Sequence, residues 1–279
     1  MILATLLLLQ AAYPPETEAV MNRARREATQ ARSSTRADAL SVYLQPEVAK
    51  KLQQCIDTAI DNPDAGIAFA KKWTDGGWSA DQCLGFAHAR KEDWVAAVTA
   101  FERAAESAQK AVAKADAARL WAQAGNAALA GAMAAKARGA FDRALADDGL
   151  PQGPARGEAH LDRARALVAL GDPAGARADL DSALQQVPQD PLAWLLSATL
   201  ARRMDDLSRA AKDIAEAKRR APDDPSVALE AGKIAVLSGD NAGARAEWTR
   251  VLSLAPSGEQ AAEVREMLAR LDSSAGQSR

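Results

Sequence analysis

The sequence predicts an all-α protein, a solenoid in which antiparallel helix pairs repeat along the chain. Alanine, which has the highest helix propensity, supplies 68 of the 279 residues. Phe, Trp and Tyr together supply only 4%, so the helices are expected to pack closely through small side chains. Prolines recur every 34 residues, at Pro188, Pro222 and Pro256. A fixed period of this length is typical of stacked helix–turn–helix units.

Five units align on this period. The last three are contiguous and the first two are separated by short insertions, which gives predicted repeats at 78–111, 118–151, 157–190, 191–224 and 225–258. Position 8 of each unit carries a small residue: Gly85, Gly125, Ala164, Ala198 and Gly232. Position 24 carries a large apolar one: Phe101, Phe141, Leu180, Ile214 and Trp248. We therefore expect two helices to approach each other at position 8, and position 24 to fill a gap between helices.

Each unit is expected to split near its middle at a turn between two helices. Four units carry a residue pair ending in Asp at this point: Glu92-Asp93, Gly171-Asp172, Asp205-Asp206 and Gly239-Asp240. The Asp side chain can accept a backbone N–H bond and so cap the second helix. Asp-Pro pairs at 190–191 and 224–225 repeat the device at the start of the first helix, where proline is tolerated. The unit at 118–151 departs from this pattern and carries Ala132-Met133.

This arrangement resembles the tetratricopeptide repeat family, and the resemblance covers five units of 34 residues, or 170 of the 279 residues. It implies a right-handed superhelical solenoid whose first helices line a concave groove. Two positions depart from the family pattern. Position 11 lacks the usual bulky aromatic residue, and position 7 includes Arg163 and Ser197, where an apolar residue is commoner. These departures change the expected distances between helices but not the architecture.

Segments on either side of the repeats are expected to complete the stack. Residues 47–77 predict a degenerate N-terminal helix pair, broken at Asn62-Pro63, because terminal units of repeat arrays are atypical. Residues 259–271 have an amphipathic pattern and predict the C-terminal capping helix that the last unit needs. The small and polar residues 272–279 predict a disordered tail.

Residues 1–12 carry a mostly apolar run that predicts a secretory signal peptide. The run is too short to cross a membrane, which takes about 20 helical residues. Because no basic residue precedes the run, a buried first helix or a slightly misplaced start codon is the alternative. Residues 13–46 predict a linker or a loosely attached helix. An exported chain would be periplasmic or secreted, whereas a chain that keeps its leader would be cytoplasmic.

Cys55 and Cys83 are the two cysteines, and both fall on the first helices of consecutive predicted pairs. In an oxidising compartment we expect them to form a disulfide, which would fasten the 47–77 pair to the regular repeats. Two buried free thiols are the alternative, because the sequence does not fix their geometry. A redox-active pair is disfavoured because no Cys-x-x-Cys motif occurs.

Several classes of function are disfavoured by what the sequence lacks. A formal net charge of −2 gives no basic excess for binding nucleic acid. Two His and two Cys do not suffice for a conventional zinc site, no cofactor fingerprint occurs, and no second apolar run could span a membrane. His88 and His160 occupy packing positions, so structural roles are favoured over general-base roles. We therefore predict a protein that is not an enzyme and holds no metal or cofactor.

The remaining candidate site is the concave groove, which in the resembled family is lined by positions 2, 5, 9, 12 and 13. The polar side chains at these positions are expected to face a partner: Arg90, Arg119, Asn126, Arg165, Thr199, Arg202, Arg203 and Lys233. Asn126 follows Gly125 as does the peptide-gripping Asn of carboxylate-clamp members, but Ala122 replaces the accompanying Lys. A mildly basic, partly apolar groove fits an extended or helical segment of acidic character. The alternative is that these charges only solubilise the groove.

The sequence thus predicts a non-catalytic scaffold that binds a protein or peptide partner on the concave face of the solenoid, in the periplasm or outside the cell. A cytoplasmic adaptor is the first alternative. A self-associating structural protein is the second, because an uncovered groove or terminal pair could accept another copy of the chain. An enzyme on a helical scaffold is the third, and no catalytic constellation supports it.

Overall fold

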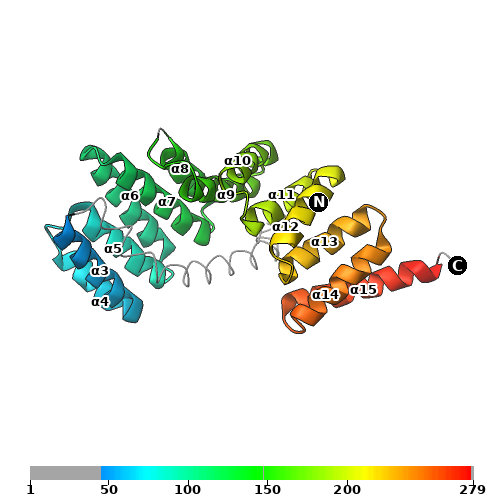
Figure 1. Ribbon diagram of the computed structural model, residues 1–279. Coiled ribbons are helices and arrows are strands. Elements are labelled where there is room, and N and C mark those ends of the chain that lie inside the picture. The colour runs from blue at the N-terminus through cyan, green and yellow to red at the C-terminus, as the bar shows by residue number, and fades with distance from the viewer. Residues whose placement is uncertain (1–44, 147, 278–279) are drawn as a thin grey trace, which may run out of the picture.

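The structure, a computed structural model, describes residues 45–146 and 148–277. Within these ranges the chain forms thirteen α-helices and no strand. Successive helices pair and stack along an arc, from α3 and α4 at one end to α14 and α15 at the other (Figure 1). The predicted all-α solenoid of helix pairs is therefore confirmed. The predicted signal peptide at 1–12 and nearly all of the predicted linker at 13–46 lie outside the described residues.

The described helices form an N-terminal pair, five further pairs and one final helix. The N-terminal pair is α3 (Pro46–Asp61) and α4 (Pro63–Lys72). The five further pairs are α5 (Gly77–Arg90) with α6 (Trp94–Lys110), α7 (Lys114–Ala130) with α8 (Ala134–Leu145), α9 (Pro154–Ala169) with α10 (Pro173–Gln186), α11 (Pro191–Arg203) with α12 (Leu207–Arg220), and α13 (Pro225–Leu237) with α14 (Asn241–Leu254). The final helix is α15 (Glu259–Gln277). In each of the five pairs the odd-numbered helix is called the first helix and the even-numbered one the second.

The C-terminal end of the stack differs from the expectation. The final helix does not end at residue 271 but continues to Gln277, so most of the predicted disordered tail at 272–279 is helical. A tertiary contact accounts for the extension, because Asp272 pairs with Arg245 of α14 and the neighbouring Leu271 is buried. The amphipathic pattern alone did not reveal this anchor.

The turn inside each of the five pairs follows one backbone scheme. The second residue before the second helix has a positive φ: 60° at Glu92, 56° at Ala132, 76° at Gly171, 61° at Asp205 and 82° at Gly239. The predicted caps are confirmed, because four carboxylates accept the backbone N–H three residues later: those of Asp93, Asp172, Asp206 and Asp240. The α7–α8 turn has Ala132 and not Gly at the position of positive φ, and Met133 at the N-cap of α8 makes no side-chain hydrogen bond. This turn therefore lacks both the conformational freedom of Gly and the cap bond.

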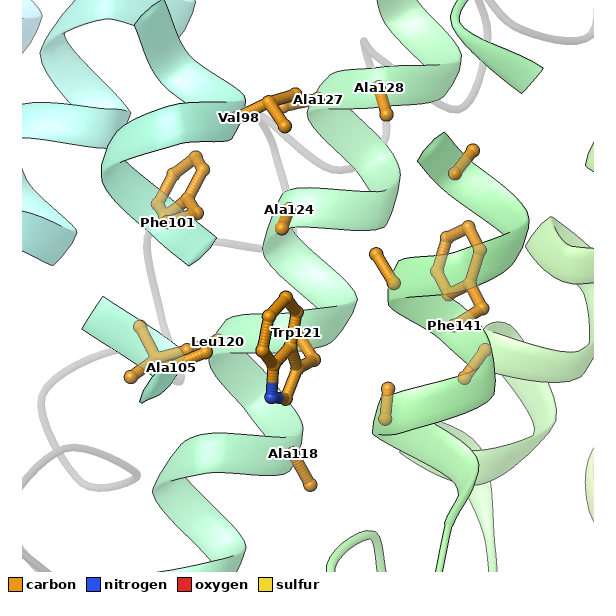
Figure 2. Packing of buried hydrophobic residues seen from close by; sticks show 14 of the residues in the cluster. Val98, Phe101, Ala105, Ala118, Leu120, Trp121, Ala124, Ala127, Ala128 and Phe141 are labelled. Carbon is orange, nitrogen blue, oxygen red and sulfur yellow. The ribbon is translucent and has the colours of Figure 1, made fainter. Parts of the chain in front are cut away.

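A small-to-large contact between the two helices of a pair forms the centre of the core. Figure 2 shows Phe101 and Phe141 on either side of the helix that carries Ala124 and the buried Trp121. A Cβ added to Gly85 would lie 2.8 Å from the Phe101 ring, and one added to Gly125 would lie 2.7 Å from the Phe141 ring. Both distances are far shorter than van der Waals contact, so each ring occupies the space that an absent methyl group leaves.

The size of the residue at position 8 follows the size of its partner at position 24. Gly232 faces Trp248, and an added Cβ would lie 2.2 Å from the indole Nε1. Where position 24 is aliphatic, position 8 is alanine and shares a buried cluster with it: Ala164 with Leu180, and Ala198 with Ile214. Glycine against aromatic rings and alanine against aliphatic chains keep every pair tightly packed.

Arginines fasten the connections between successive pairs. The guanidinium groups donate to the carbonyl oxygens of the three prolines that lie 34 residues apart: Arg220 to Pro188 at 2.8 Å, Arg250 to Pro222 at 2.7 Å and Arg265 to Pro256 at 2.7 Å. The first two of these bonds reach from the second helix of the following pair. The prolines that reveal the repeat in the sequence therefore also supply the acceptors that join neighbouring units.

The N-terminal pair is tied to the first repeat by its own first helix. Cys55 of α3 and Cys83 of α5 form a disulfide in the structure, with Cα atoms 6.1 Å apart, and both residues are fully buried. Leu52, Ile56 and Trp73 pack in the same cluster. The degenerate pair thus joins the solenoid through a covalent bond as well as through apolar contacts.

Replacing Gly125 with Ala tests the small-to-large contact. Because the added methyl group would overlap the Phe141 ring, we expect the free energy of unfolding to fall by about 1–3 kcal/mol. Gly139 is the matched control, since it lies in α8 and nothing lies within 4 Å of a Cβ added there. Gly139→Ala is expected to raise the stability by about 0.5–1 kcal/mol. Urea denaturation measures both values.

The same contact predicts a rescue. Adding Phe141→Leu to Gly125→Ala reproduces the alanine–leucine pair found at Ala164 and Leu180, so the double variant should recover part of the lost stability. A Gly125→Ala variant as stable as the wild type would contradict the contact.

Reduction of the disulfide is expected to destabilise the protein. The bond closes a loop of sequence separation 28, for which the chain-entropy model gives roughly 3–4 kcal/mol. Thermal unfolding with and without a reductant measures the change, and a Cys55→Ala/Cys83→Ala variant is the control that should not respond to the reductant. Equal midpoints for the oxidised and the reduced wild type would be the contrary result.

Candidate functional site

The eight polar residues predicted to face a partner lie on the five first helices. Arg90 ends α5, Arg119 and Asn126 lie on α7, Arg165 lies on α9, Thr199, Arg202 and Arg203 lie on α11, and Lys233 lies on α13. We call this set the groove residues. Neighbouring first helices touch at α7 with α9 and at α11 with α13. A hydrogen bond between glutamine side chains joins α5 to α7, and buried side chains of α9 and α11 share one apolar cluster. The groove residues are therefore presented by one continuous layer of helices.

Four of the groove residues are cations that already pair with a carboxylate. Arg119 pairs with Asp116, and Arg165 Nη1 lies 2.6 Å from Asp162 Oδ1. Arg202 Nε lies 2.6 Å from Glu230 Oε1, and Lys233 Nζ lies 2.8 Å from Glu263 Oε1. Four of the six groove cations are therefore balanced by carboxylates, and the basic character of the groove is weaker than the sequence suggests. The acidic partners lie outside positions 2, 5, 9, 12 and 13 of the five repeats, so those positions alone do not show them.

One of these pairs joins two first helices, and another joins the last first helix to α15. Arg202 of α11 reaches the buried Glu230 of α13, and Lys233 of α13 reaches Glu263 of α15. At the other end of the solenoid, Gln82 of α5 donates to Gln123 of α7 at 3.4 Å. These contacts hold the layer of first helices together, so Arg202 and Lys233 serve the stack whatever else they contact.

The other groove residues are more open to solvent. Arg90, Asn126 and Arg203 are exposed, and Thr199 is half-buried. Half-buried apolar side chains on the first helices lie among them, at Val168, Leu192 and Val236. The layer of first helices therefore presents polar and apolar groups together, with little uncompensated charge.

A buried carboxylate explains the unusual Arg163. Both oxygens of Asp179 accept hydrogen bonds from Arg163 at 2.7 Å, and His160 Nδ1 lies 2.9 Å from Oδ1. Burial of the carboxyl would raise the pKa of Asp179, but the hydrogen bonds from Arg163 and His160 hold that pKa below its usual range. Arg163 also donates to Asp142 of α8 at 2.9 Å. His160 thus has a structural role, linking α9 to α10.

The same device recurs one unit later. The Ser197 hydroxyl donates to the buried Asp213, and Arg177 donates to that hydroxyl at 2.8 Å. Position 23 of the last three repeats is always acidic: Asp179, Asp213 and Glu247. These acidic residues were not among the predicted site residues, although their 34-residue spacing, together with Arg163 and Ser197 at position 7, carried the signal.

In residues 45–146 and 148–277 no group of three or more His, Cys, Asp or Glu side chains could hold a metal ion. His88 Nδ1 lies 3.3 Å from a carboxylate oxygen of Asp93, the residue that caps the N-terminus of α6. Among the helices of the described ranges, none combines the length and the apolar character that crossing a bilayer requires.

Comparison with known proteins identifies the architecture. Residues 157–200 match the family model of the tetratricopeptide repeat. PilF from Pseudomonas aeruginosa superimposes with a TM-score of 0.63 at 14% identity, over 79% of this chain and 99% of that one. A tetratricopeptide repeat protein from Parabacteroides merdae gives 0.62 at 15% identity, over 79% and 87% of the two chains. No curated protein sequence matches this chain.

A third structural relative is described by its binding site. YrrB, a tetratricopeptide repeat protein with an unusual peptide-binding site, superimposes with a TM-score of 0.54 at 16% identity, over 72% of this chain and 97% of that one. At such low identities the likeness establishes the fold alone.

Replacing Asp179 with Asn tests the buried carboxylate. At pH 7 the change leaves Arg163 with only the exposed Asp142 as its counter-charge, and we expect the free energy of unfolding to fall by about 2–3 kcal/mol. The pKa of Asp179 is lower in the folded state than in the unfolded state, where it is about 4. The ionised carboxylate therefore contributes fully to the free energy of unfolding above about pH 4, and this contribution is lost as the pH falls through the folded pKa. The difference between the variant and the wild type should therefore shrink towards pH 2.

Urea denaturation at pH 7 and at low pH measures this dependence. Asp61→Asn is the control, because Asp61 is exposed at the end of α3 and its replacement should change the stability by no more than about 0.5 kcal/mol. A stability difference for Asp179→Asn that stays constant with pH would show that the carboxylate carries no such linkage.

Proposed function

We propose that this chain, a member of the tetratricopeptide repeat family, binds a protein or peptide segment across its first helices and catalyses no reaction. The observation that carries the proposal is the continuous layer of first helices, which presents exposed polar and half-buried apolar side chains together. The peptide-binding site described for YrrB supports it by analogy of fold. Protein interaction is the general role of the family, and the concave position of the site is our inference.

The charge pairs indicate what kind of segment would bind. Arg165, Arg202 and Lys233 are mostly buried and each is committed to a carboxylate, so they offer little net attraction to an acidic partner. Releasing one of them would leave its carboxylate unpaired, at a cost of several kcal/mol for a buried group. We therefore propose a largely neutral segment that gains its affinity from apolar contacts with the half-buried side chains and from hydrogen bonds.

A stacked architecture favours this mode of binding. The contact between positions 8 and 24 fixes the two helices of each repeat, and arginine–proline bonds join the last three repeats to one another. Because the layer of first helices is formed before the partner arrives, little conformational entropy of the protein is lost on binding. Affinity then depends on how the partner fits several helices at once.

We further propose that the chain acts in the periplasm or outside the cell. The apolar run at 1–12, which lies outside the described residues, supports export. The Cys55–Cys83 pair supports an oxidising compartment, where a disulfide persists. The mass of the mature protein tests both at once: we expect a chain without the leader and with two hydrogen atoms fewer. An intact Met1 with two free thiols would contradict export.

A groove variant tests the binding proposal. Arg90→Glu, Asn126→Ala and Thr199→Ala change exposed or half-buried groups that make no hydrogen bond or ion pair within the described residues, so the fold should survive. We expect affinity for a captured partner to fall by about tenfold or more, since central contacts dominate binding energy. Affinity of the wild type should change little with salt, because the proposed segment is largely neutral and binding then includes few charge interactions that salt could screen.

A matched variant controls for changes in surface charge. Lys136→Glu and Lys212→Glu alter exposed residues of the second helices α8 and α12, and should leave binding unchanged. Arg202 is unsuitable as a test, because a carboxylate there would face the buried Glu230. If the groove variant captures the same proteins at the same affinity as the wild type, the assignment of the site is wrong.

A further inference from the structure

A row of exposed apolar side chains follows the turns inside the last three repeats. Leu170 is 42% exposed, Met204 is 44% exposed and Leu237 is 54% exposed. Leu170 and Met204 occupy the same position of successive units, and Leu237 lies one position earlier in the next unit. These are half of the six large hydrophobic residues that stand exposed in the described ranges, so they concentrate on one edge of the solenoid.

An apolar depression lies beside Met204, one of the three residues of this row. It has a volume of about 490 Å³ and is lined by Val168, Pro173, Leu200, Arg203 and Met204. The lining comes from α9, α10 and α11 and from the turn after α11, so the depression spans the seam between two repeats. A monomeric protein exposes such repeated apolar groups where another molecule binds.

Acidic side chains accompany the apolar row. The turns at 169–173, 203–206 and 237–241 carry four aspartates, Asp172, Asp205, Asp206 and Asp240, against one basic residue, Arg203. Three of the aspartates cap helices through one oxygen and remain exposed, and Asp205 is exposed as well. We call Leu170, Met204, Leu237 and these four aspartates the turn edge. Its charge is opposite to that of a basic partner.

We propose that the turn edge docks a basic amphipathic helix of a partner protein. Residues seven apart lie on one face of a helix, about 10.5 Å apart along its axis. Leucines at that spacing would give the partner one apolar face to set against the apolar residues of the turn edge. Lys or Arg beside them would face the aspartates. The depression shares Val168 and Arg203 with the layer of first helices, but a basic helix has a different charge from the neutral segment proposed for that layer.

Two helical peptides test the proposal on the full-length protein. Both carry leucines seven residues apart, and the leucines are flanked by lysines in one peptide and by glutamates in the other. Fluorescence titration at low salt should show the lysine peptide binding at least about tenfold more tightly than the glutamate peptide, with the difference falling as salt rises.

Two variants locate the binding. Leu170→Gln/Met204→Gln/Leu237→Gln should weaken the lysine peptide about tenfold or more. Asp172→Asn/Asp205→Asn/Asp206→Asn/Asp240→Asn keeps the helix caps and the positive φ, since Asn serves both, and should abolish the preference for lysine. The groove variant Arg90→Glu/Asn126→Ala/Thr199→Ala should bind the peptide as the wild type does. The groove variant is expected to lose affinity for the segment that binds the first helices, but its affinity for the lysine peptide should not change.

Three results would overturn the proposal. The first is equal binding of the lysine and glutamate peptides. The second is loss of peptide binding in the groove variant but not in the glutamine variant, which would place the peptide on the first helices. The third is a concentration-dependent dimer in sedimentation that the glutamine variant abolishes, because a second copy of the chain would then cover the turn edge.

Discussion

The fit between a small residue on one helix and a large residue on its partner is the constraint on which the solenoid depends. Gly125 lets the Phe141 ring approach so closely that even one methyl group would overlap it, and Gly232 does the same for Trp248. The contact fixes the two helices of each pair, and the fixed pairs can then stack. The disposition of the first helices, and hence of any surface that they present, follows from this packing inside the pair.

Much of this architecture is readable in the sequence because it repeats. A residue type that recurs at one position in five units reports a local requirement, and the aspartate caps and the alternation of small and large residues were predicted in this way. The charge pairs were harder to predict. Arg202 and Glu230 are 28 residues apart on neighbouring first helices, so their contact depends on how helices of different units approach. The ion pair of Asp272 with Arg245, which accompanies the extension of α15, likewise depends on how two helices approach each other.

The polar residues show how a repeat can change its chemistry without changing its fold. Arg163 and Ser197 replace apolar residues at position 7, and each is balanced by an aspartate at position 23 of the same unit. On the first helices, Arg119, Arg165, Arg202 and Lys233 are likewise each paired with a carboxylate. Consequently the number of basic residues along a face is a poor guide to what that face attracts, and the exposed groups that the fold leaves uncompensated are a better one.

Exchange of the small-to-large pair in the fourth repeat tests the account most directly. Ala198→Gly and Ile214→Phe would each disturb a fitted contact, whereas together they recreate the glycine–phenylalanine pair of the second repeat. The measurement is the coupling free energy from a double-mutant cycle in urea. The account predicts that the double variant is more stable than the sum of the single changes by at least about 1 kcal/mol. Strict additivity of the two changes would contradict it.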